Sequence, residues 1–203
     1  VAENAVRLAK ILKPTTSRYF FWGDDGVPWC RCRHCKGLSD SDQALIVNEN
    51  VLEAVKQHDP KAMVAHLAYA NTLQPPRQIK PRPGIFLEFA PIDRPYDQPL
   101  SSGNPDSHHY LEMLKANLEL FGKENSQALE YWLDVSLFSR WKKPAVKLPF
   151  KPSVLADDLK TYATLGVRHV TSFAVYIDSD YVQRYGEPPI GEYGSTVLAF
   201  RPI

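Results

Sequence analysis

The residues best suited to catalysis or metal binding lie in one loop, directly after the aromatic run that ends at Trp22. Asp24 and Asp25 come first. Adjacent carboxylates suit the hydrolysis of a glycosidic bond, in which one acid protonates the leaving oxygen while the other is oriented differently. Neighbouring strand residues point to opposite faces, so both acids reach one ligand only if the turn at Gly26 twists the chain. The alternative is a turn-forming Asp-Asp-Gly whose side chains accept local hydrogen bonds.

All three cysteines of the chain follow in the same loop, as Cys30-x-Cys32-x2-Cys35. They offer three soft ligands, and His34 or a more distant residue could supply the fourth ligand of a structural zinc site. A catalytic zinc fits this pattern less well, because three thiolates make a poor Lewis acid. The alternatives are a disulfide with one free thiol and three reduced cysteines. Nothing nearby completes a Cys–His nucleophile pair.

Two further acids interrupt apolar segments, Glu88 in the run 85–89 and Asp134 in the run 130–134. An acid inside an apolar strand is costly unless it is paired or hydrogen-bonded, so both are candidates for the site. A structural ion pair is the alternative for each. Stacking faces and hydrogen bonds for a sugar ring are expected from Trp22, Tyr69, Asn71, Tyr131 and Trp132, each of which could also be ordinary core.

These residues must be positioned by apolar strands that alternate with amphipathic helices, a pattern typical of βα units and a mainly parallel sheet. The clearest unit is the last, in which a helix over 155–167 ends at the C-cap glycine Gly166 and a strand over 169–177 follows. The other predicted helices are 5–12, 41–58 and 110–120, and the other predicted strands are 19–22, 62–69, 84–89 and 129–137.

Five such units are visible, whereas a closed barrel needs eight. The sequence therefore predicts an α/β fold in which residues 1–203 form a single domain, the C-terminal part of a (β/α)8 TIM-type barrel catalytic domain. An open sheet of the same elements is the alternative. The long loop over 91–107, rich in Pro, Asp, Ser and Gly, is expected to help shape a substrate groove.

Composition and apolar patterning argue against nucleic-acid binding and against a membrane span. Basic residues number 24 and acidic residues 23, which leaves a formal net charge of +1 without a basic stripe, so nucleic acid is not an expected partner. No apolar stretch reaches the roughly 18 residues of a membrane helix, so no membrane span is expected. The N-terminal residues lack a signal-peptide pattern.

The cysteine motif is part of a longer pattern. An Asp-Gly precedes Trp29-Cys30-x-Cys32-x2-Cys35, and the pattern continues with Ser41-Asp42, Val47-Asn48, Ala68-Tyr69 and Leu73-x-Pro75-Pro76. Together these residues resemble the bacterial domain-of-unknown-function family 4838, well over roughly residues 20–120 and loosely over the remainder. That family overlaps glycoside hydrolase family 163. The resemblance thus implies a (β/α)8 barrel and a secreted endo-β-N-acetylglucosaminidase that acts on complex N-glycans.

The resemblance also implies roles for individual residues. Hydrolases of this type use a retaining, substrate-assisted mechanism and place a carboxylate pair at the end of the fourth barrel strand, which matches the strand 19–22 when units are counted back from the last. Asp25 is then the general acid/base and Asp24 the group that orients the substrate acetamide, with Glu88 as the rival for either role. Catalysis would need no cofactor, the cysteines could hold structural zinc, and the protein would be extracellular, periplasmic or on the cell surface.

Two other hypotheses remain open at this stage. The chain could be a non-catalytic carbohydrate-binding or zinc-stabilised barrel module, because a fold does not fix a function. It could also be a metal-dependent hydrolase that uses the cysteine loop, in which case chelation would abolish its activity.

Overall fold

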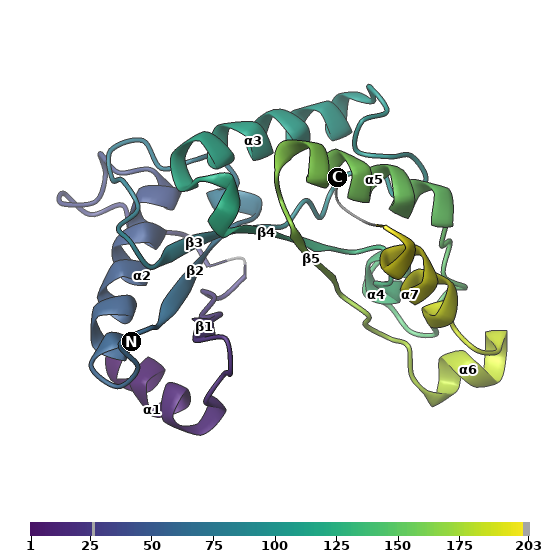
Figure 1. Ribbon diagram of the computed structural model, residues 1–203, viewed down its shortest axis with the longest axis horizontal. Coiled ribbons are helices and arrows are strands. Elements are labelled where there is room, and N and C mark those ends of the chain that lie inside the picture. The colour runs from purple at the N-terminus through teal and green to yellow at the C-terminus, as the bar shows by residue number, and fades with distance from the viewer. Residues whose placement is uncertain (26, 201–203) are drawn as a thin grey trace. The chain divides into compact units, whose positions relative to one another are not determined.

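The computed structural model describes residues 1–25 and 27–200. Gly26, where the sequence predicts a turn, lies outside the described residues. The chain divides into two compact units. The first unit comprises Val1–Ala90 and Met113–Ser126, and the second comprises Pro91–Glu112 and the chain from Gln127 onward. Figure 1 shows the elements of both units in the order of the chain.

The first unit is built on parallel strands. Strand β1 (Arg18–Tyr19) pairs with β2 (Met63–Ala68), which pairs with β3 (Ile85–Phe89), both in parallel. Helix α2 packs against β2 and against helix α1 (Figure 1). The helical elements of this unit are α1 (Ala2–Leu12), α2 (Asp40–Lys56), the 3-10 turns η1 (Ala70–Thr72) and η2 (Lys123–Asn125), and residues 113–121 of α3 (Pro105–Phe121).

Local sequence explains why α2 and β3 form where they do. Helix α2 begins with a capping box, in which the Ser39 hydroxyl accepts from the Asp42 backbone N–H and the Asp42 carboxylate accepts from the Ser39 backbone N–H. Its apolar face, which includes Leu45, Leu52 and Val55, is buried. Every residue of β3 is buried, as expected for a strand with covered faces in a parallel sheet.

The second unit also contains parallel strands and helices. Strand β4 (Ser126–Glu130) pairs in parallel with β5 (His169–Ser172). Helix α5 ends at Gly166, whose φ of 88° places it in the left-handed conformation that favours glycine at a helix C-cap. The helices of this unit are α4 (Val135–Phe138), α5 (Pro152–Leu165), α6 (Ser179–Tyr185), α7 (Ile190–Ala199) and the first part of α3. One apolar cluster contains Leu133, Val135, Ala145, Leu148 and Tyr181.

The structure confirms the α/β class, the parallel pairing and the central elements of the predicted pattern. Completion to an eight-unit barrel and the single domain over residues 1–203 stay predictions. Among the described residues, no helix combines the length and the apolar character that crossing a bilayer requires.

Three predicted strands are too long. Strand β1 ends at Tyr19, β4 at Glu130 and β5 at Ser172. The prediction for 129–137 is wrong beyond Glu130, because the chain turns there and Asp134 caps helix α4. An apolar run indicates burial in either a strand or a helix, and the local sequence does not separate the two.

Candidate functional site

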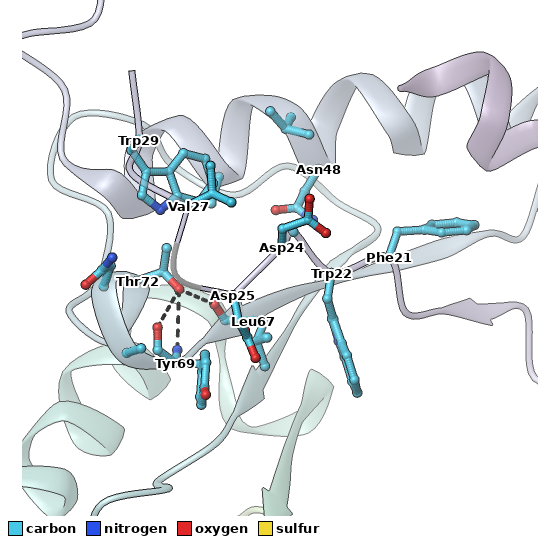
Figure 2. Close-up of a pocket in the computed structure, with 15 residues that line it drawn as sticks. Phe21, Trp22, Asp24, Asp25, Val27, Trp29, Asn48, Leu67, Tyr69 and Thr72 are labelled. Carbon is cyan, nitrogen blue, oxygen red and sulfur yellow. Dashed lines mark hydrogen bonds between the residues drawn. The ribbon is translucent and has the colours of Figure 1, made fainter. Parts of the chain in front are cut away.

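A cavity of about 110 Å³ lies in the first unit, between the loop that follows β1, the end of β2 and helix α2. The carboxyl end of parallel strands is where ligands bind in α/β folds. Figure 2 shows the side chains around the cavity. The residues of the sequence prediction that the structure brings together here are Trp22, Asp24, Asp25, Tyr69 and Asn71.

The two adjacent acids approach the cavity from one backbone segment but point to different sides. In Figure 2, Asp24 extends toward the side where Asn48 lies, and Asp25 extends toward Leu67 and Tyr69. Both acids are exposed. The Asn48 side chain is fixed by donating to the Ala65 carbonyl at 2.8 Å, which ties α2 to β2. The two carboxylates therefore face different parts of the cavity.

Tyr69 and Asn71 are positioned by the short turn η1. The Thr72 hydroxyl lies 2.8 Å from the Leu67 carbonyl and 2.9 Å from the Tyr69 carbonyl, and it accepts from the Tyr69 N–H at 3.4 Å (Figure 2). Ala70 takes a positive φ of 44° to make this turn. Sequence reasoning missed Thr72. Its signal is a Ser/Thr-type turn four residues after the end of β2.

Glu88 is connected to the cavity through Trp22. Glu88 pairs with Leu67 in the β2–β3 register, so the two side chains lie on the same face of the sheet, and Leu67 lines the cavity. The Glu88 side chain is only 1% exposed, and its Oε2 accepts from the Trp22 indole N–H at 2.7 Å. Glu88 is therefore placed to hold Trp22 in the cavity wall.

The three cysteines gather at one point of the loop. The Sγ atoms of Cys30, Cys32 and Cys35 all lie within 4.8 Å of one another, and the group could hold a metal ion. A tight turn forms the cluster, because the backbone N–H groups of Cys35 and Lys36 donate to the Cys32 carbonyl at 3.0 and 2.9 Å. His34 instead accepts from the Arg33 Nε at 3.0 Å. The described residues add no fourth Cys, His or acid to this group.

The thiols of the cluster differ in acidity. Hydrogen bonds from the backbone N–H groups of His34 and Cys35, and then from the neighbouring thiols, lower the pKa of Cys32 to about 7. Its own hydrogen bonds to Cys32 and Cys30 raise the pKa of Cys35 to about 11. Backbone N–H groups, and after them the neighbouring thiols, thus favour the thiolate form of Cys32 near neutral pH.

A second cavity, of about 620 Å³, shares a wall with the first. Its volume lies in the range of small-molecule sites. Cys30 and Cys35 line this cavity, together with apolar residues of α1 and α2. The residues that line both cavities include Trp22, Asp24, Trp29, Val47 and Asn48.

Asp42 ties the start of α2 to the loop 77–79 and was not predicted as a site residue. Its buried Oδ1 accepts from the backbone N–H groups of Arg77, Gln78 and Ile79, at 3.0, 2.8 and 2.9 Å. Burial alone would raise the pKa of Asp42, but hydrogen bonds from Ser39 and these backbone groups lower it to about 2. The carboxylate thus ties the start of α2 to a distant loop.

Three predicted substrate-binding residues lie in the second unit. Tyr131 stacks on Phe173 with ring centroids 5.3 Å apart. The Trp132 indole N–H donates to Asp158 at 2.9 Å, and Asp134 accepts from the Leu137 N–H as the N-cap of α4. All three side chains are buried, and the contacts described here give each of them a structural role in the second unit. Their role in binding a substrate stays a prediction.

A buried charge network organises the second unit and was missed from the sequence. The Arg94 Nη2 contacts Glu130 at 3.1 Å and Asp158, and all three side chains are fully buried. The hydroxyls of Tyr96 and Tyr162 donate to Glu130. Burial raises the pKa of Glu130, and hydrogen bonds and the Arg94 charge oppose this effect. Two features of the sequence could have indicated the network: Glu130 is an acid at a strand end, and Asp158 is an acid on the apolar face of α5.

Comparison with known proteins gives one family. The family model described as "Domain of unknown function (DUF4838)" matches residues 21–185, which is more than half of the chain. No curated protein matches the chain, and no solved structure matches it. The matched range contains Asp24 and Asp25, the three cysteines, and Tyr69 and Asn71 of the first cavity.

Proposed function

Because the chain belongs to the DUF4838 family, we propose that it is a glycoside hydrolase, a retaining endo-β-N-acetylglucosaminidase that acts on complex N-glycans. The observation that carries the proposal is the Asp24–Asp25 pair, which lines a strand-end cavity beside Trp22 and Tyr69. Carboxylates can supply the acid–base chemistry of glycoside hydrolysis, and aromatic faces can pack against a sugar ring. In this proposal the parallel βα units belong to a (β/α)8 barrel, and the protein is exported to the periplasm, cell surface or medium.

The proposed mechanism uses the substrate's own acetamido group. Its carbonyl oxygen attacks the anomeric carbon while Asp25 donates a proton to the leaving oxygen, so the glycosidic bond breaks and a cyclic intermediate forms. Asp24 orients the acetamide N–H during this step. Water, deprotonated by Asp25, then opens the intermediate with net retention of configuration. The different directions of the two side chains support this division of roles (Figure 2).

The aromatic side chains of the cavity would hold the sugar ring. Trp22 is 46% exposed although its indole N–H is bound to Glu88, so one part of the ring system is fixed and another is open to a ligand. Tyr69 and Trp29 are partly buried in the same wall. Glu88, held beneath Trp22, remains the rival for the acid role.

The ion proposed for the cysteine cluster is zinc, in a structural role. Three thiols within 4.8 Å match the preference of Zn²⁺ for thiolate ligands. Catalysis in this proposal needs no cofactor, because the acetamido group and the carboxylates supply the nucleophile and the acid. Each residue of the cluster would contribute one sulfur, and the ion would supply a cross-link within the loop.

A non-catalytic carbohydrate-binding or zinc-stabilised module is the second candidate. It is favoured by the exposure of both acids, since an acid with free access to water is also a good hydrogen-bond acceptor for sugar hydroxyls. In that case the same cavity binds a glycan without cleaving it.

The test is a glycan-release assay with the wild type and an Asp25→Asn variant, on complex N-glycoproteins and aryl N-acetylglucosaminides, read by mass spectrometry. Loss of the acid is expected to lower kcat by roughly 10²–10⁴-fold while binding persists. Glu53→Gln, an exposed acid of α2, is the matched control and should leave release unchanged. Equal release by Asp25→Asn would transfer the acid role to Glu88, and no release by the wild type would favour the binding module.

A further inference from the structure

The cysteine cluster and the proposed substrate cavity have a common wall. Cys30 and Cys35 line the larger cavity, and Trp29, the neighbour of Cys30 in the chain, lines both cavities. Asp24 also lines both. The cluster and an aromatic face of the cavity are therefore carried by adjacent residues of one loop.

Near the cysteines, the loop that carries these residues contacts the start of α2 through Cys30 and Arg31. No helix or strand forms between Tyr19 and Asp40 in the described part of the chain. The Cys30 carbonyl accepts from the Gln43 side chain of α2 at 3.2 Å. Arg31 forms an ion pair with Asp40 at 2.6 Å, but the Arg31 side chain is 60% exposed, so this pair stabilises the loop little.

A metal ion would add a further constraint on the loop. Ligation joins three points of a short segment, Cys30, Cys32 and Cys35, whose sulfur atoms are already within 4.8 Å. Because binding energy of a structural ion acts as folding energy of the segment that supplies the ligands, ligation would restrict the backbone on both sides of the cluster. Trp29 directly precedes Cys30 and therefore lies in the backbone that ligation would restrict.

We propose that a zinc ion bound by Cys30, Cys32 and Cys35 sets the affinity of the cavity for its substrate, because it fixes the loop that carries Trp29. The inference rests on the proposed function for the identity of the substrate. The three cysteines are positioning residues in this scheme and take no part in bond cleavage. Zinc removal should therefore raise KM and leave kcat nearly unchanged.

The test uses the full chain, zinc alone as the metal probe, and 4-nitrophenyl N-acetyl-β-glucosaminide as the substrate. Zinc per chain is measured for the wild type, Cys32→Ser and His34→Ala. The wild type and His34→Ala should hold one ion per chain and Cys32→Ser should hold none, because His34 contacts Arg33 rather than the cluster. Chelation of the wild type should raise KM by roughly 3- to 10-fold, the effect of having to order one side chain upon binding, with kcat within about twofold.

A second readout separates this inference from the proposed function. Trp29 emission, obtained as the difference between the wild type and a Trp29→Phe variant, should change when zinc is added and should not change in Cys32→Ser. If the zinc-loaded protein cleaves nothing, the hydrolase proposal fails, while the Trp29 response still decides the coupling. The inference is overturned if the wild type binds no zinc, if Cys32→Ser binds zinc as the wild type does, or if zinc changes neither KM nor Trp29 emission.

Discussion

Replacement of Asp42 by Asn tests whether a buried carboxylate stabilises the fold by tying the start of α2 to the loop 77–79. The Oδ1 atom accepts three backbone N–H groups of residues 77–79, and Oδ2 accepts the backbone N–H and the hydroxyl of Ser39. Asn can replace only one of these oxygens, and its NH₂ group would face the Ser39 N–H. The variant therefore loses the charge and at least one buried hydrogen bond.

The size of the effect follows from the pKa of Asp42, which falls from 3.8 to about 2 in the folded protein. At about 1.4 kcal/mol per pKa unit, the charged form contributes about 2 kcal/mol. A lost hydrogen bond adds about 1 kcal/mol. The free energy of unfolding should thus fall by about 3 kcal/mol at pH 7, a large part of the stability of a typical domain.

The pH dependence provides an independent check. Because the folded pKa of Asp42 lies below the unfolded value, its stabilisation is fully present above about pH 4 and is lost as the pH falls toward 2. Urea unfolding of the wild type and Asp42→Asn should therefore differ by about 3 kcal/mol at pH 7, and about half of the charge contribution should be lost by pH 3.

Asp40→Asn is the matched control, since Asp40 lies in the same first turn of α2 and pairs with the exposed Arg31. It should cost less than about 1 kcal/mol. The reasoning is refuted if Asp42→Asn changes the unfolding free energy no more than this control does, or if the gap between Asp42→Asn and the wild type stays constant from pH 7 to pH 3.

Three further predictions concern Arg94, His66 and Trp22. Arg94→Met should destabilise the protein by about 3–5 kcal/mol in urea unfolding, because it leaves two buried carboxylates without their cation, whereas the exposed Arg7→Met should change little. Burial lowers the pKa of His66 to about 4, so the stability that is present above pH 6.5 is lost as the pH falls toward 4. The free energy of unfolding should fall by about 2 kcal/mol between pH 7 and pH 5. The His66→Leu variant should not show this loss. Trp22→Phe removes one hydrogen bond to Glu88 and should cost about 1–2 kcal/mol in thermal unfolding and raise KM; an unchanged KM would contradict the role of Trp22 in the cavity wall.

The amino-acid sequence by itself determined those elements whose signals are local. Helix α5 and its C-cap Gly166 follow from apolar spacing and a glycine, and the cysteine cluster follows from ligands only a few residues apart. In each case the interacting atoms are close along the chain, so their contact does not depend on the path of the rest of the protein. The predicted gathering of Asp24, Asp25, Tyr69 and Asn71 relied on one further rule, that parallel strands end at a common edge.

Tertiary structure alone decided which distant groups meet. Trp22 and Glu88 are 66 residues apart, Arg94 and Asp158 are 64 apart, and Asp42 reaches a loop 35–37 residues away. Apolar periodicity indicates that such residues are buried, but the partner of a buried polar group depends on strand register and helix packing, which bring together segments that share no local signal. A buried charge needs a hydrogen-bond or ion-pair partner, and the tertiary structure determines which residue is close enough to be that partner.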